Sequence, residues 1–267
     1  MIRQPVVAGS FYPAESEELS AQVDAFLNFS SEPRKVKGLI VPHAGYIYSG
    51  AVAGEVFAAA EIPRQVILIG PNHHGAGADI AVSGAESWKI PAATIPVATS
   101  LRQQLVAQIP DLLIDDRAHE HEHSLEVMLP FLLRRQPELQ IVPIALGHLS
   151  FADCLRLGGA IAQVLKSWKG EVLLLASTDM NHFSSAEISE KLDFMAIDAM
   201  RAYALQQLYQ VVRDNQISMC GVLPTITVMQ AAYDLGAREC QLIRYAHSGQ
   251  VNGDNRRVVG YAGLTLE

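Results

Sequence analysis

The feature that most constrains the fold of this chain is a repeated alternation of short apolar runs with longer amphipathic segments. Apolar runs bounded by turn residues are typical of buried strands, and apolar residues three and four positions apart are typical of helices. The predicted strands are residues 38–42, 65–70, 140–146 and 171–177. The predicted helices are residues 51–61, 100–109, 123–135, 151–167, 186–208 and 222–235. This order predicts a three-layer α/β/α fold with a mostly parallel central sheet.

The C-terminal part of the sequence predicts a different kind of pairing. Residues 241–247 and 257–264 have strand character, and the segment between them contains Asn252-Gly253, a strong hairpin signal. We therefore expect an antiparallel pair to complete the sheet. The chain has no internal repeat and no Pro/Gly/Ser-rich linker, and 267 residues suit one large α/β domain. We therefore expect residues 1–267 to form a single domain.

Charge and composition exclude several classes of function. A formal net charge of -8 and the absence of a basic stripe argue against nucleic-acid binding. The longest uncharged stretch, residues 38–54, contains Pro42, Gly45 and Gly50, which argues against a membrane span. The first residues lack the pattern of a signal peptide, so we expect a cytoplasmic protein. Three cysteines without a CxxC pair predict reduced thiols.

Histidines follow the ends of the predicted strands. His43, the pair His73-His74, His148 and His182 each come soon after such a run. In a parallel sheet, ligands bind beyond the carboxyl ends of the strands, so we expect these side chains to converge on one crevice. Any one of them, taken alone, is better interpreted as a loop or core histidine with satisfied ring nitrogens. Taken together, they predict metal binding, proton transfer or both.

Two of these strand ends raise further questions. In extended backbone, His73 and His74 point to opposite sides, so one of them should enter the site. Asp179 lies three residues before His182 and could orient an imidazole or accept a proton. An equally good interpretation makes Asp179 the N-cap of the following helix.

The segment of residues 119–126 has three histidines at alternate positions. Ser124 and the apolar residues after it indicate a helix start, with Glu126 adding the negative charge that a first turn favours. We interpret His119 and His121 as parts of a solvated acidic loop. His123, at the entrance of the predicted helix, remains a candidate site residue.

Cys220 directly precedes a predicted apolar helix that has Pro224 near its beginning. Because a helix N-terminus lowers the pKa of a thiol, this position predicts a thiolate that binds metal or acts as a nucleophile. Cys154 and Cys240 lie in ordinary helical and strand contexts and are expected to be buried apolar residues. The chain contains no GxSxG, GxxxxGK[ST], GxGxxG or HExxH motif, so these classes of enzyme are not the default.

Several sequence blocks, in this order, resemble the Memo (mediator of cell motility) family. Its bacterial and archaeal members are called AmmeMemoRadiSam system protein B. The blocks run nearly from end to end of the chain. They are AGSFY at 8–12, PHAGY at 42–46, GPNHH at 70–74, EHSLE at 122–126 with LPF at 129–131, STDMNH at 177–182, and CG at 220–221.

The resemblance implies a fold similar to the catalytic subunit of class III extradiol dioxygenases, which hold Fe(II) with two histidines and a carboxylate. Carried over, the metal ligands would be His43, His73 and Cys220. Catalytic residues would be His182, Asp179 and His123. A cysteine stands where the dioxygenases use glutamate, and a soft thiolate favours copper(I), zinc or a differently tuned iron. The expected cofactor is therefore Fe(II) or copper, with zinc as the alternative.

Three functions follow from the residues and the resemblance. The leading hypothesis is a metal-dependent, dioxygenase-like redox enzyme of unknown substrate. The alternative is a binding module that recognises a peptide in the same pocket without turnover, as eukaryotic members are implied to do with phosphotyrosine peptides. The third is metal-assisted hydrolysis through an activated water. The family name also implies a radical-SAM protein and an AMMECR1-domain protein as partners.

Overall fold

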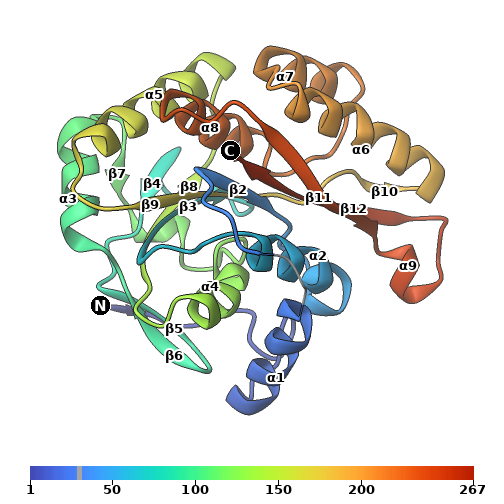
Figure 1. Ribbon diagram of the computed structural model, residues 1–267, viewed down its shortest axis with the longest axis horizontal. Helices are drawn as coiled ribbons and strands as arrows, with labels where there is room; N and C mark the ends of the chain where they lie inside the picture. Colours follow the sequence, from blue (N-terminus) through green and yellow to red (C-terminus); the bar gives the residue numbers. More distant parts are fainter. Residues whose placement is uncertain (29–31) are drawn as a thin grey trace.

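A central sheet, covered by helices on both faces, organises the computed structural model, which describes residues 1–28 and 32–267 (Figure 1). The sheet order is β10-β12-β2-β9-β3-β8-β4-β7, and β11, which lies outside this linear order, also pairs with β12. Its four central strands are parallel: β2 (Gly38–Val41), β9 (Val172–Ser177), β3 (Gln65–Pro71) and β8 (Gln140–Leu146). Each lies within one or two residues of its predicted range. In the described ranges, no helix combines the length and apolar character needed to cross a membrane.

Antiparallel strands flank this parallel centre. β12 (Val258–Leu266) runs antiparallel to β2, to β11 (Cys240–His247) and to β10 (His182–Ser184). At the opposite edge, β4 (Ile80–Val82) pairs antiparallel with β8 and parallel with β7 (Leu113–Ile114). The predicted C-terminal antiparallel pair is confirmed.

The connection between these two strands is longer than a two-residue hairpin turn. Residues 248–257 connect the two strands and contain a short helix, α9 (Gly249–Asn252). Gly253 ends this helix in a left-handed conformation, with φ of 77°. Asn252-Gly253 therefore acts as a helix terminus, which has the same need for positive φ as a two-residue hairpin turn.

The two helical layers follow from the alternation of side chains along the strands. Ile40, Ile67 and Leu174 belong to one core cluster, and Leu39 and Val66 belong to the other. The first cluster lies under α3 (Thr99–Gln108), α5 (Phe151–Ser167), α6 (Ala186–Arg201), α7 (Leu205–Asp214) and α8 (Val222–Asp234). The second lies under α1 (Ser16–Leu27), α2 (Tyr46–Ala59) and α4 (Leu129–Arg135). Because strand side chains point alternately to the two faces, runs buried on both sides need two helical layers. The three-layer prediction is confirmed.

Three predicted helices have different bounds from those expected. The helix predicted at 51–61 is α2, which begins at Tyr46 and ends at Ala59. The helix predicted at 186–208 is two helices, because Tyr203 between α6 and α7 adopts a left-handed φ of 54° that a helix cannot continue through. The helix predicted at 123–135 begins only after a 3-10 turn, η2 (Glu126–Met128), which leads into α4. His123 consequently lies in a loop.

The N-terminal layer contains elements that the sequence did not predict. The helix α1 was not expected, nor was a small second sheet formed by β1 (Ile2–Arg3), β5 (Ser87–Ile90) and β6 (Ala93–Pro96). Among the predicted helices, α5 matches its range, and Ser150 and Asp153 form the capping box that sets its start.

Candidate metal centre

His43 follows β2 at the carboxyl edge of the sheet and is 2% exposed. Its Nδ1 lies 2.8 Å from Oγ of Ser177, and that hydroxyl donates its own hydrogen to the carbonyl of Ser124 at 2.7 Å. The Ser177 oxygen must therefore accept a hydrogen from Nδ1, which leaves a lone pair on Nε2 of His43. Burial and the neighbouring His73 lower the pKa of His43 to about 3, so its ring is neutral.

His73 follows β3 and is fixed by Glu122, which is 1% exposed. One carboxylate oxygen of Glu122 lies 2.9 Å from Nδ1 of His73, and the other accepts the backbone N–H of His73 at 2.7 Å. Burial lowers the pKa of His73, but the hydrogen bond and charge of Glu122 outweigh it and raise the pKa above its usual value. Nδ1–H therefore points at the carboxylate, and in the neutral ring Nε2 carries the free lone pair.

The Glu122 carboxylate is ionised. It also accepts the backbone N–H groups of His123 and Ser124 at 2.9 and 2.8 Å. Burial raises the pKa of Glu122, but the bonds and charge of His73 and the backbone donors outweigh it and hold the pKa far below its usual range. A fixed negative charge thus lies directly behind the histidines.

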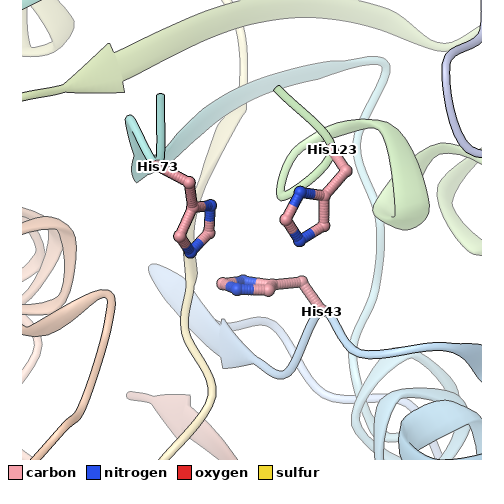
Figure 2. Close-up of side chains that lie close together, drawn as sticks. All are labelled: His43, His73 and His123. Carbon is pink, nitrogen blue, oxygen red and sulfur yellow. The ribbon is translucent and has the colours of Figure 1, made fainter. Parts of the chain in front are cut away.

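His123 completes a cluster of three imidazoles (Figure 2). One ring nitrogen of each of His43, His73 and His123 lies within 4.8 Å of the others. The rings of His73 and His123 stack with centroids 4.8 Å apart, and His43 lies edge-on to both. Burial and the proximity of His43 lower the pKa of His123 to about 4, so this ring is neutral as well.

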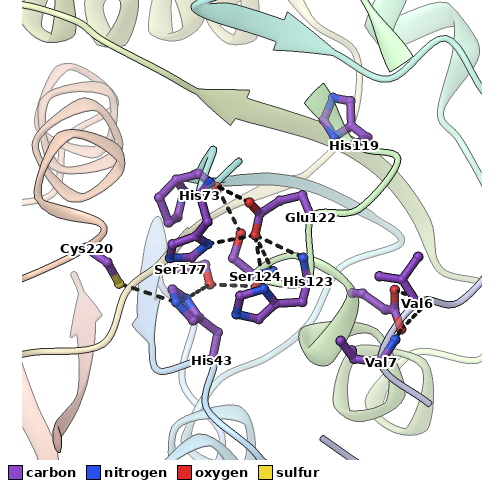
Figure 3. A network of polar contacts seen from close by, with 12 residues as sticks. Val6, Val7, His43, His73, His119, Glu122, His123, Ser124, Ser177 and Cys220 are labelled. Atoms are coloured by element: carbon purple, nitrogen blue, oxygen red, sulfur yellow. Dashed lines mark hydrogen bonds and ion pairs between the residues drawn. The ribbon is translucent and has the colours of Figure 1, made fainter. Parts of the chain in front are cut away.

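Cys220 lies beside the cluster, just before α8 (Figure 3). Its Sγ is 3.3 Å from Nε2 of His43. Among the described residues, the group within 4.8 Å of one another comprises the three imidazoles and does not include this sulfur. The expected thiolate is not what this environment produces, since burial and the nearby Asp179 raise the pKa of Cys220 to about 12. Desolvation outweighs the helix terminus, and the thiol is protonated without a metal.

Asp179 contacts His43, and His182 begins β10 three residues later. One Asp179 oxygen accepts the backbone N–H of His43 at 2.8 Å, and the other lies 3.9 Å from Nε2 of His43. Burial raises the pKa of Asp179. Asp179 is not an N-cap, because it precedes β10 and the cap of α6 is Ser185. Nδ1 of His182 is 3.0 Å from the carbonyl of Ser218, which leaves its Nε2 as the unprotonated nitrogen in the neutral ring.

The other histidines lie outside the cluster. His74 is exposed, and its ring lies 6.1 Å from that of His121, so His73 is the member of its pair that enters the site. His148 is exposed and does not join the cluster. It lines a cavity of about 260 Å³ that also reaches His73 and Cys220. The predicted convergence of strand ends therefore holds for His43 and His73, while His148 borders the adjoining space.

The interpretation of His119 as part of a solvated loop is wrong. His119 is fully buried, and its Nε2 lies 3.1 Å from the carbonyl of Ala81. Burial lowers its pKa to about 4. His121 is exposed, as expected. The alternate histidines thus diverge, because the backbone at 119–123 turns instead of running extended.

Sequence reasoning missed Glu122 and Ser177 as supports of the rings. Both lie inside the blocks that carry the family resemblance, which was the available signal. Their roles depend on contacts across the chain, from Glu122 to His73 and from Ser177 to His43. The resulting arrangement offers neutral imidazole lone pairs in one place, backed by a buried carboxylate, which suits a transition-metal ion.

Comparisons with known proteins extend this picture. The family model described as Memo-like protein matches residues 3–265. A MEMO1 family protein of Aquifex aeolicus is 38% identical over 265 residues, covering 98% of both chains. A second, from Methanosarcina barkeri, is 35% identical over 268 residues and covers 100% of both. The solved structure of an uncharacterized protein, JW3007 of Escherichia coli K12, shares the fold with a TM-score of 0.60 at 13% identity, covering 85% of this chain and 99% of that one.

Proposed function

The chain belongs to the Memo-like protein family, and we propose that it is a metal-dependent redox enzyme whose ion is held by the imidazole cluster. His43, His73 and His123 would bind the ion, with Cys220 as a sulfur donor beside His43. The observation that carries this proposal is the gathering of one nitrogen from each ring within 4.8 Å. Two of those rings already have Nδ1 committed to a partner, so their lone pairs are preset for a ligand.

Fe(II) and copper are the ions we propose, with zinc as the alternative. Imidazole suits all three, and a neighbouring sulfur shifts the preference toward the softer copper(I) or zinc. Bound iron or copper would supply the one-electron and oxygen chemistry that side chains lack. Substrate would enter through the cavity of about 260 Å³ that borders His73 and Cys220.

The surrounding residues are placed to handle protons. Burial raises the pKa of Asp179, so this carboxyl next to His43 accepts a proton more readily than a solvent-exposed carboxyl would. His182 presents Nε2 as a proton acceptor, because its Nδ1 is tied to the carbonyl of Ser218. Together, Asp179 and His182 would serve as the acid and base of the site.

Metal analysis of the purified protein tests the assignment. We expect bound iron or copper in the wild type, loss of metal in His43→Ala, and weakened binding in Cys220→Ser. His148→Ala is the matched control, because His148 is exposed and outside the cluster. Unchanged metal content in His43→Ala would refute the ligand assignment. Oxygen uptake by iron-, copper- and zinc-loaded protein then separates redox chemistry from other uses of the same site.

A binding module is the second candidate, and Phe183 is the observation that favours it. Phe183 is 64% exposed next to His182 and has a left-handed φ of 66°, which is unusual for a bulky side chain. An exposed aromatic side chain near the site suits recognition of a peptide. A binding module should lose peptide affinity in Phe183→Ala and keep this affinity after metal removal. A metalloenzyme should lose its activity after metal removal and keep its activity in Phe183→Ala.

Metal-assisted hydrolysis is the third candidate, since three imidazoles are also a zinc donor set that can activate water. Hydrolytic activity found only in the zinc-loaded protein would favour hydrolysis over redox chemistry. We also propose a radical-SAM protein and an AMMECR1-domain protein as partners, on the family resemblance alone. Co-purification of either protein with the tagged chain would test this.

A further inference from the structure

A buried ion pair outside the cluster connects to both segments that border His123. Arg3, at 8% exposed, pairs with Glu126, which is fully buried. The guanidinium also lies 4.3 Å from the ring centroid of Trp88. Neither charged residue contacts the three imidazoles, so any effect on the cluster must pass through the backbone that the pair holds.

Arg3 holds the loop that carries Glu122 and His123. Its Nε donates to the carbonyl of His119 at 3.1 Å, and its Nη2 donates to the carbonyl of Glu122. These two acceptors mark the beginning and end of the turn from 119 to 122. Fixing them sets where the Glu122 carboxylate meets His73 and where His123 leaves the loop.

Glu126 holds the other segment. Its carboxylate accepts the backbone N–H groups of Val6 and Val7 at 3.0 to 3.1 Å and the hydroxyl of Tyr12 at 2.6 Å. Between these anchors lies Phe11, whose ring is 4.8 Å from the ring of His123. Glu126 therefore holds the segment of residues 6–12, which places Phe11 against this imidazole.

We propose that Arg3 is a positioning residue of the metal centre and acts through the loop of residues 119–123. Its partner Glu126 holds residues 6–12, which place Phe11 against His123. The rigid fork of a guanidinium can bond two carbonyls and a carboxylate at once, which lysine cannot reproduce. A merely structural pair would affect unfolding and leave the imidazoles as they are. The inference rests on the proposed function for its metal readout and on ring geometry for a second one.

Cobalt(II) titration of matched variants is the first test. The double variant Arg3→Met/Glu126→Gln removes the pair without leaving a lone buried charge. The control is Arg102→Met, because Arg102 is also 8% exposed and donates to two carbonyls, those of Ser83 and Ala85, at 2.9 and 2.8 Å. We expect cobalt affinity to fall about 10- to 100-fold in the double variant and to stay unchanged in the control. A folded double variant with wild-type cobalt affinity would overturn the proposal.

Nuclear magnetic resonance of the imidazole nitrogens, without metal, is the second test. Arg3→Lys keeps the charge opposite Glu126 and guards against the double variant failing to fold. We expect the ring signals of His73 and His123 to shift in Arg3→Lys and to remain in place in Arg102→Met. Unchanged ring signals in Arg3→Lys would contradict a positioning role. If wild-type protein fails to bind cobalt, the proposed function fails, and the ring signals still decide this inference.

Discussion

The carboxylate of Glu122 accepts both polar hydrogens of His73, from ring Nδ1 at 2.9 Å and from the backbone N at 2.7 Å. This double contact fixes the tautomer, the ring orientation and the backbone of His73 before any ligand arrives. Side chains that are already oriented lose less conformational freedom when an ion binds. An ionised carboxylate behind the imidazole also makes the ring a better electron-pair donor to a metal ion. The candidate centre is therefore organised as much by Glu122 as by its three rings.

Glu122→Gln should weaken metal binding about 10- to 100-fold, the effect typical of losing a carboxylate behind a ligating histidine. The amide keeps the shape, but it lacks the charge and one of its ends cannot accept a hydrogen bond. Titration with zinc or cobalt(II) measures the change. Glu120→Gln is the control, because Glu120 is an exposed neighbour. Equal affinities for the two variants would show that Glu122 does not support the site.

In the Cys220→Ser variant, which has no thiol proton to lose, metal affinity should depend on pH through about one proton between pH 5 and pH 6.5. An imidazole must be neutral to bind a metal ion. The pKa values of His43 and His123, about 3 and about 4, keep these rings neutral in this window, whereas Glu122 raises the pKa of His73. Affinity should thus fall about tenfold per pH unit as pH decreases. Cobalt titrations at several pH values give the slope, and a slope of two or three protons would contradict the assignment of the charges.

The sequence predicts the centre of the sheet well because parallel strands buried on both faces are continuous runs of apolar residues. Strand β3 reads QVILIGP, and its apolar residues pack into both core clusters. The histidines after β2 and β3 were found for the same reason, since strand ends fix their location. Tertiary contacts decide the rest. Glu122, Ser177 and the buried His119 depend on partners that sequence spacing does not reveal.

A local sequence signal can fit two different structures when both need the same backbone conformation. Gly253 needs positive φ, which suits both a hairpin turn and the helix end that it forms. At Tyr203, by contrast, the sequence has apolar helical periodicity, yet φ of 54° ends the helix. Cys220 shows the same limit in its chemistry, because the helix terminus was visible in the sequence and the desolvation was not.

The thiol of Cys220 should react slowly with disulfide reagents at pH 8 in metal-free protein. A pKa of about 12, caused by burial and Asp179, leaves little thiolate at that pH. The rate should keep rising as pH increases from 7 to 10. A variant with Cys154→Ala and Cys240→Ala isolates this signal, because it leaves Cys220 as the one thiol among the three cysteines of the chain. A rate that levels off below pH 8 would indicate the thiolate that a helix terminus alone would favour.

The buried carboxyl of Asp193 should make the protein less stable as pH rises from 4 to 7. Asp193 accepts hydrogen bonds from the backbone of Asn181 at 2.7 Å and from the hydroxyl of Tyr245 at 2.8 Å, but burial raises its pKa to about 7. The native state thus favours the protonated form, so its stabilising contribution is complete below the unfolded pKa near 3.8 and is lost as pH rises through 7. The loss amounts to about 4 kcal/mol at most, from roughly three pKa units at ~1.4 kcal/mol each.

Asp193→Asn removes the ionisation and keeps an acceptor for Asn181 N–H. Urea unfolding at pH 4.5 and pH 8 should therefore show a smaller decline in the variant than in the wild type. Equal declines in the two proteins would mean that Asp193 is already ionised at pH 4.5 in the folded state.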